Sequence, residues 1–195
     1  MNGSEDITIT GQRIYYTDKP ELVIMDSEET PLMKRFSEIV TSNGGDILEI
    51  GFGMGISADF IYNSKIDSYT CIEIHPRIYQ MALEWAKDKP NATILHGNWI
   101  DVIPKIQEKF DGIFMDTFEY TNYEKFESVC KSVAKYDCIL SMFIPCGIHN
   151  KSMEIDLFEF QKLDYLQMKD NRFEIYYSFF NGSDFVKKSK PNKLI

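Results

Sequence analysis

The sequence predicts a single α/β domain: an open, doubly wound, mostly parallel sheet with helices on both faces. Short apolar runs alternate with stretches of helical periodicity from residue 46 to residue 144. Parallel strands are buried on both faces and therefore appear as continuous apolar runs, and repeated strand–helix units build such sheets. A glycine-rich segment, ILEIGFGMGIS at residues 47–57, contains the end of the first run. A chain of 195 residues with 44% apolar content can bury one core of this size.

A small hairpin should precede this sheet. Ile7–Thr10 and Arg13–Thr17 alternate apolar with polar residues, and Gly11-Gln12 can turn the chain between them. Thr30 and Pro31 then have the residue types of a helix N-cap and first helical position. We expect residues 1–30 to form an N-terminal extension that covers the site of a single domain spanning residues 1–195.

Strands and helices should then alternate along the chain. The expected strands are Asp46–Ile50, Tyr69–Ile74, Ala92–Leu95, Gly112–Met115 and Cys138–Ile144. The expected helices are Ile56–Asn63, Pro76–Lys87, Ile100–Lys109 and Tyr123–Lys135. Near the end of the chain, Arg172–Phe180 alternates and suits a late, antiparallel strand.

The net charge of the chain limits the classes of partner that it can bind. A net charge of −9 repels nucleic acid and anionic lipid and attracts cations. Lysines gather only at residues 187–195, which we expect to be a frayed, disordered basic tail. No apolar run reaches the ~18 residues of a membrane span, and the first residues do not resemble a signal peptide. The expected location is the cytoplasm, and the oligomeric state stays open, with a homodimer as one arrangement.

The four cysteines, at positions 71, 130, 138 and 146, include no Cys-x-x-Cys pair. Three of them lie in apolar stretches, as reduced cysteines that pack as small hydrophobic side chains do. We therefore expect no metal site.

The glycine loop begins like a dinucleotide fingerprint and then departs from it. Gly51-Phe52-Gly53 starts the G-x-G-x-x-G pattern, but Ile56 stands at the third glycine and Gly55 comes one residue early. This spacing weakens the case for a pyrophosphate. A ligand without phosphate, such as S-adenosylmethionine, still needs close approach to bare backbone.

Two further strand ends favour an adenosine-bearing ligand. Glu73 ends the second strand, about twenty positions after the first glycine, where a carboxylate can accept hydrogen bonds from both ribose hydroxyls. Asn98-Trp99 follows the third strand, where an aromatic ring could cover an adenine.

Acids stand at two other places. Asp116 follows the fourth strand directly and should lie beside the cofactor, although a solvated loop acid is the ordinary explanation. Glu29 belongs to the acidic run Asp26–Glu29 before a helix, which the helix dipole would also explain.

Three motifs occur in one order along the chain. They are Glu29-Thr30-Pro31-x-Met33, then Leu48-Glu49-x-Gly51-Phe52-Gly53-Met54, then Phe110-Asp111-Gly112-Ile113-x-x-Asp116-Thr117. From about Leu22 to Ile144 the chain thus resembles the guanidinoacetate N-methyltransferase family. The resemblance implies the seven-stranded, Rossmann-like fold of S-adenosylmethionine-dependent methyltransferases, and a small guanidino or amino compound as the methyl acceptor.

The resemblance also implies roles by position. The cofactor would contact the loop residues Gly51, Phe52, Gly53, Met54, Gly55, Ile56 and Ser57, with Met25 and Met33 nearby. Its ribose and adenine would lie against Glu73, Ile74, His75, Asn98 and Trp99, with Asp116 alongside. Asp116 and Glu29 would be the catalytic pair that holds the guanidinium. A guanidinium is a poor nucleophile, and two carboxylates can orient it and accept its proton.

Departures from the family concern the acceptor. The polar segment that receives the substrate carboxylate in the family is replaced by Ile144-Pro145-Cys146, and the tyrosine after its Asp-Thr is Phe118. We therefore expect an acceptor less anionic than guanidinoacetate. His149 and Asn150 could line the same pocket. Two alternatives stay open: an aminopropyltransferase of the spermidine-synthase type, and a non-catalytic S-adenosylmethionine-binding protein.

Overall fold

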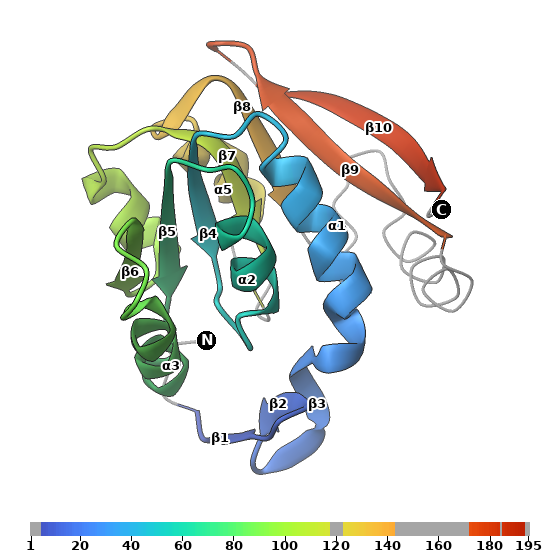
Figure 1. The fold of residues 1–195 in the computed structure, drawn as a ribbon, viewed down its shortest axis with the longest axis vertical. Coiled ribbons are helices and arrows are strands. Elements are labelled where there is room, and N and C mark those ends of the chain that lie inside the picture. The colour runs from blue at the N-terminus through green and yellow to red at the C-terminus, as the bar shows by residue number, and fades with distance from the viewer. Residues whose placement is uncertain (1–4, 118–122, 143–171, 184, 194–195) are drawn as a thin grey trace.

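The structure is a computed structural model that describes residues 5–117, 123–142, 172–183 and 185–193 (Figure 1). The predictions about Phe118, Ile144-Pro145-Cys146, His149 and Asn150 fall outside these residues.

The predicted doubly wound sheet is confirmed. It has seven strands in the order β10-β9-β8-β7-β4-β5-β6. The parallel strands are β4 (Asp46–Ile50), β5 (Ser68–Glu73), β6 (Ala92–His96), β7 (Phe110–Met115) and β8 (Ala134–Met142). At one edge β9 (Arg172–Phe180) runs antiparallel to β8, and β10 (Phe185–Lys193) runs antiparallel to β9.

Helices cover both faces of this sheet. The described helices of the domain are α1 (Thr30–Val40), α2 (Ile56–Tyr62), α3 (Pro76–Ala86), α4 (Trp99–Val102) and α5 (Tyr123–Cys130). The first three share one core with Ile47 of β4, whereas α4 and α5 share the other with Leu48 and Ile50. Successive residues of β4 therefore face opposite cores, as strand geometry requires.

The N-terminal extension is a three-stranded antiparallel sheet rather than a hairpin alone. The expected pair is present as β1 (Ile7–Ile9) and β2 (Arg13–Tyr16), and β3 (Lys19–Asp26) pairs with β2. The third strand was not predicted because its first four residues are exposed and show no alternation. In Figure 1 this sheet lies at the lower ends of α1 and α3.

The start of α1 differs from its prediction. A 3₁₀ turn, η1 (Ser27–Glu29), precedes the helix, and the Asp26 side chain caps it by accepting from the Glu28 N–H at 2.9 Å. Glu29 accepts in return from the Asp26 N–H at 3.1 Å. Thr30 is therefore the first residue of the helix and not its N-cap, because this reciprocal capping starts the helical chain earlier.

Two predicted helices are shorter than expected. The one over Ile100–Lys109 is only α4 followed by a 3₁₀ turn, η2 (Ile103–Lys105), where Pro104 cannot donate a helical hydrogen bond. The one over Tyr123–Lys135 ends at Cys130, because Lys135 belongs to β8. The Lys135 Nζ lies 2.7 Å from carboxylate oxygens of both Asp46 and Asp111.

The basic tail also departs from its prediction. Residues 187–193, expected to be disordered, belong to β10 and pair with β9 along the edge of the sheet. Cys71, Cys130 and Cys138 are all buried, as expected of cysteines that pack as small hydrophobic side chains do. None of the helices in the described parts of the chain is long and apolar enough to cross a membrane.

Candidate active site

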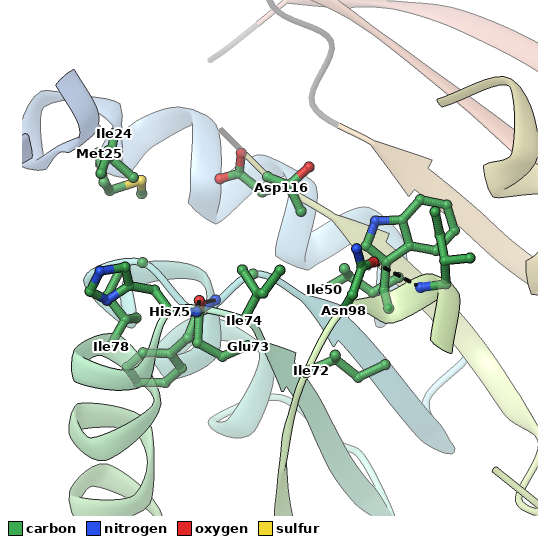
Figure 2. A pocket seen from close by; sticks show the side chains of 17 residues that line it. Ile24, Met25, Ile50, Ile72, Glu73, Ile74, His75, Ile78, Asn98 and Asp116 are labelled. Carbon is green, nitrogen blue, oxygen red and sulfur yellow. Dashed lines mark hydrogen bonds between the residues drawn. The ribbon is translucent and has the colours of Figure 1, made fainter. Parts of the chain in front are cut away.

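A cleft opens at the carboxyl ends of the parallel strands, beside β3 of the N-terminal sheet (Figure 2). The predicted site residues that line it are Met25, Gly51, Phe52, Gly53, Glu73, Ile74, His75, Asn98, Trp99 and Asp116. These residues come from five separate segments of the chain. Their convergence follows from the parallel sheet, which brings the ends of β4, β5, β6 and β7 to one edge.

The glycine loop has no side chain at position 51 because the end of β7 lies against its backbone there. Gly51 has a φ of +92°, and a Cβ there would lie 2.0 Å from the Asp116 carbonyl oxygen. The Gly51 N–H donates to the Ile72 carbonyl at 2.9 Å, and the Asp116 N–H donates to the Ile50 carbonyl at 2.9 Å. The way in which these three strands join therefore requires glycine at position 51.

Glu73 connects the end of β5 to this loop. Its carboxylate accepts hydrogen bonds from the Phe52 N–H at 2.8 Å and the His75 N–H at 2.7 Å. Burial raises the pKa of Glu73, and these backbone N–H groups oppose that rise. Each carboxylate oxygen has two acceptor positions, so both can still receive a ribose hydroxyl.

Asn98 and Trp99 form the wall at the end of β6. The Asn98 side-chain oxygen accepts from the Ile100 N–H at 3.1 Å and caps α4 (Figure 2). Trp99 is buried, and its ring packs edge-to-face on Phe126 with centroids 5.8 Å apart. The indole is therefore held in place before any ligand arrives.

His75 connects the N-terminal segment with the residues that line the cleft. It is the N-cap of α3, and its Nδ1 accepts from the Arg77 N–H at 3.3 Å. Its Nε2 lies 2.9 Å from the Glu5 carbonyl oxygen, to which it can donate a hydrogen bond. Arg77 donates to the Ile7 carbonyl and lies 3.6 Å from Asp6.

The two predicted catalytic acids interact through their charges. Burial raises the pKa of Asp116 to about 7, and the carboxylate of Glu49 adds to that rise. Burial also raises the pKa of Glu29 to about 8, with the charge of Asp116 as the second cause. Asp116 lines the cleft, whereas Glu29 is not among the lining residues and lies in the turn before α1.

No lysine or arginine lines the cleft, within the parts of the chain that the structure describes. The ionisable residues among the described lining are Glu73, His75 and Asp116. Such a lining disfavours the two negative charges of a pyrophosphate and favours a cationic ligand.

Six predicted site residues do not line the cleft: Glu29, Met33, Met54, Gly55, Ile56 and Ser57. Met33 is completely buried in the core, and Ser57 points to Glu49, because the first turn of α2 faces the sheet. The lining also contains residues that were not predicted, namely Ile24, Ile50, Ile72, Ile78, Gly97, Ile100 and Thr117. Most of these are neighbours of predicted residues at strand ends, and that adjacency was the available signal.

Comparisons with known proteins lead to the same family and the same kind of fold that the glycine loop and the sheet order indicate. A sequence model of the family described as guanidinoacetate N-methyltransferase matches residues 11–162. Protein arginine N-methyltransferase 2 of Saccharomyces cerevisiae is 29% identical over 170 residues, or 76% of this chain. The chain spans only 28% to 40% of the length of the first such fungal relatives.

Solved structures share the fold at low identity. An O-methyltransferase from Bacillus cereus, in complex with SAH, has a TM-score of 0.52 at 15% identity and covers 80% of this chain and 78% of its own. Spermidine synthase from Thermotoga maritima has a TM-score of 0.52 at 17% identity, over 97% of this chain and 72% of its own.

The fold and the cleft define the class of Rossmann-like methyltransferases, with S-adenosylmethionine as the cofactor. Within that class, the chain belongs to the guanidinoacetate N-methyltransferase family.

Proposed function

We propose that this protein transfers the methyl group of S-adenosylmethionine to a nitrogen of a guanidino compound. The observation that carries the proposal is the position of Asp116 on a cleft whose described lining includes no lysine or arginine, with Glu29 as the second acid in the turn before α1. A guanidinium is the cationic, planar group that such a pair of carboxylates suits.

The residues of the cleft fit this cofactor. Gly51 and Gly53 line the cleft without side chains, and Glu73 offers acceptors to ribose hydroxyls. S-adenosylmethionine, when bound, supplies a methyl group on a positively charged sulfur. The acidic lining suits that charge, whereas a dinucleotide would bring a pyrophosphate to a site whose described lining includes neither lysine nor arginine.

The acids would orient the acceptor and remove its proton. A carboxyl with a pKa near 7 is a stronger base than an ordinary aspartate, and it can still be ionised at neutral pH. The arriving guanidinium favours the ionised forms of both acids because opposite charges attract. Orientation provides much of the remaining acceleration, since attack requires the nitrogen about 3–3.5 Å from the methyl carbon.

We propose a small guanidine that is less anionic than guanidinoacetate as the acceptor. The fungal relatives, named protein arginine N-methyltransferase 2, make an arginine side chain within a protein the second candidate. Both present the same guanidinium, so the two acids alone do not distinguish them.

The test is methyl transfer from labelled S-adenosylmethionine to four acceptors: guanidinoacetate, agmatine, an arginine-bearing peptide and putrescine. We expect agmatine to have a higher kcat/KM than guanidinoacetate, with the difference shrinking as salt screens the acids. Preference for the peptide would transfer the proposal from a small guanidine to protein arginine.

The alternatives have their own results. Product from putrescine with decarboxylated cofactor, and none from any guanidine, would establish an aminopropyltransferase. Cofactor binding without turnover on any acceptor would favour a non-catalytic binding protein.

A further inference from the structure

Glu49 is a completely buried carboxylate that the proposed mechanism does not use. It lies on β4, two residues before Gly51, and its side chain faces α2 rather than the cleft. One of its oxygens accepts from the Ser57 hydroxyl in the first turn of α2, and the other accepts from the Tyr69 hydroxyl on β5. Glu49 therefore ties the helix that follows the glycine loop to the neighbouring strand.

This connection extends to a second helix, α1. The Ser57 carbonyl lies 3.3 Å from the Ser37 hydroxyl of α1, which also donates to the Met33 carbonyl at 2.8 Å. The turn at the start of α2 is thus held by polar contacts from both sides. A loop held in this way needs little reordering when a ligand arrives.

The charge of Glu49 has no cationic partner in the described parts of the chain, where none of the ion pairs includes it. Two neutral hydroxyls are its only hydrogen-bond donors there. Its charged neighbours are acids: Glu73 and Asp59 act on it, and it acts on Asp116. Tyr69 and Cys71 are the other titratable groups beside it. A buried charge among like charges is costly unless a cation binds nearby.

We propose that Glu49 is a positioning residue of the cofactor site, which holds the start of α2 behind the glycine loop and supplies a buried negative charge that favours the sulfonium cofactor over its neutral thioether product. The inference rests on the proposed methyl transfer. In this role the charge of Glu49 favours binding of S-adenosylmethionine over its thioether product, because only S-adenosylmethionine carries a charged sulfur. This difference helps the spent cofactor leave.

The test compares two ligands that differ at the sulfur. Affinities for S-adenosylmethionine and S-adenosylhomocysteine are measured by calorimetry at pH 8 for the wild type, Glu49→Gln and Glu84→Gln. Glu84 is an exposed glutamate of α3 and provides the same chemical change away from the cleft. We expect Glu49→Gln to weaken the sulfonium ligand about tenfold and the thioether less than about threefold, because only the first loses a Coulombic partner. Glu84→Gln should change neither.

Tyr69→Phe provides a second route if Glu49→Gln does not fold. Removing the hydroxyl takes away a donor that favours ionised Glu49, so the preference for the sulfonium should fall at pH 7 and recover at pH 9. Equal weakening of both ligands in Glu49→Gln, or a preference unchanged in both variants, would overturn this role while leaving methyl transfer intact. A wild type that binds neither ligand would overturn the proposed function and this inference together.

Discussion

The carboxylate of Glu73 at the end of β5 accepts a hydrogen bond of 2.8 Å from the backbone N–H of Phe52 in the glycine loop. The same carboxylate accepts from the His75 N–H at 2.7 Å, at the start of α3. One side chain therefore connects the loop expected to hold the methionine part of the cofactor with the helix expected beside its ribose. Glu73 thus supports the loop, and we propose that it also binds the cofactor.

Replacing Glu73 should consequently weaken cofactor binding. Glu73→Ala removes the acceptor for ribose hydroxyls and leaves two backbone N–H groups without a partner. Charge-assisted hydrogen bonds contribute about 1.5–3 kcal/mol each, so we expect affinity to fall by roughly one to two orders of magnitude. Calorimetry with S-adenosylmethionine measures this loss. Unchanged affinity, or tight NAD binding by the wild type, would refute the assignment.

Gly51 should tolerate no side chain. At a φ of +92°, with the Asp116 carbonyl in the place of a Cβ, Gly51→Ala must shift the loop and the end of β7. We expect a loss of stability greater than about 1 kcal/mol together with loss of cofactor binding. Gly11→Ala is the matched control, because a Cβ there would meet nothing within 4 Å. Thermal unfolding and calorimetry of both variants make the comparison, and a stable, binding-competent Gly51→Ala would contradict it.

Asp116→Asn should abolish turnover and leave cofactor binding largely intact. The amide preserves size but loses charge and basicity, so acceptor binding and proton removal suffer while contacts to the cofactor remain. Initial rates with the preferred guanidine provide the measurement. Retention of more than about a tenth of the wild-type rate, equivalent to under about 1.4 kcal/mol of barrier, would exclude Asp116 as a catalytic residue.

Activity and stability should change in opposite directions with pH. Asp116 and Glu29 have pKa values of about 7 and about 8 in the folded protein, well above those of ordinary carboxyls. The folded state thus binds these protons more tightly than the unfolded chain, and its stability is lost as pH rises from about 5 to 8. Catalysis needs the ionised base, so kcat/KM should rise about tenfold per unit up to pH 7. Thermal unfolding and rates across this range test both signs, and parallel trends would disprove the assignment.

Arg77 should help the N-terminal sheet retain the cofactor. Its guanidinium donates to the Ile7 carbonyl and lies near Asp6, so it fastens β1 to the start of α3. Arg77→Ala is expected to destabilise this attachment by about 1 kcal/mol and to speed cofactor dissociation. Stopped-flow measurement of the dissociation rate checks the effect, with Lys87→Ala at the exposed end of α3 as control. Equal rates in both variants would show that residues 5–26 do not cover the bound cofactor.

Much of the parallel sheet could be predicted from sequence because its strands are buried on both faces. The strands β4, β5 and β7 consist mainly of apolar residues, and burial of nearly every residue explains that pattern. The start of α3 could be predicted for a local reason, since Pro76 follows a residue that caps the helix. The order of the glycines and acidic residues along the chain was enough to predict where the cleft lies and to which family the protein belongs.

Tertiary structure alone decided features whose stabilising contacts come from distant residues. β3 forms because β2 pairs with it, and β10 forms because β9 does, although neither has a strand pattern of its own. Lys135 belongs to β8 rather than to a helix because its ammonium group forms ion pairs with Asp46 and Asp111. In the sequence Glu49 is only an acidic residue of a motif, whereas in the structure the hydroxyls of Ser57 and Tyr69 donate hydrogen bonds to its carboxylate. Local patterns report the environment of a residue on its own element, whereas a hydrogen bond across 20 residues of chain depends on how the elements pack.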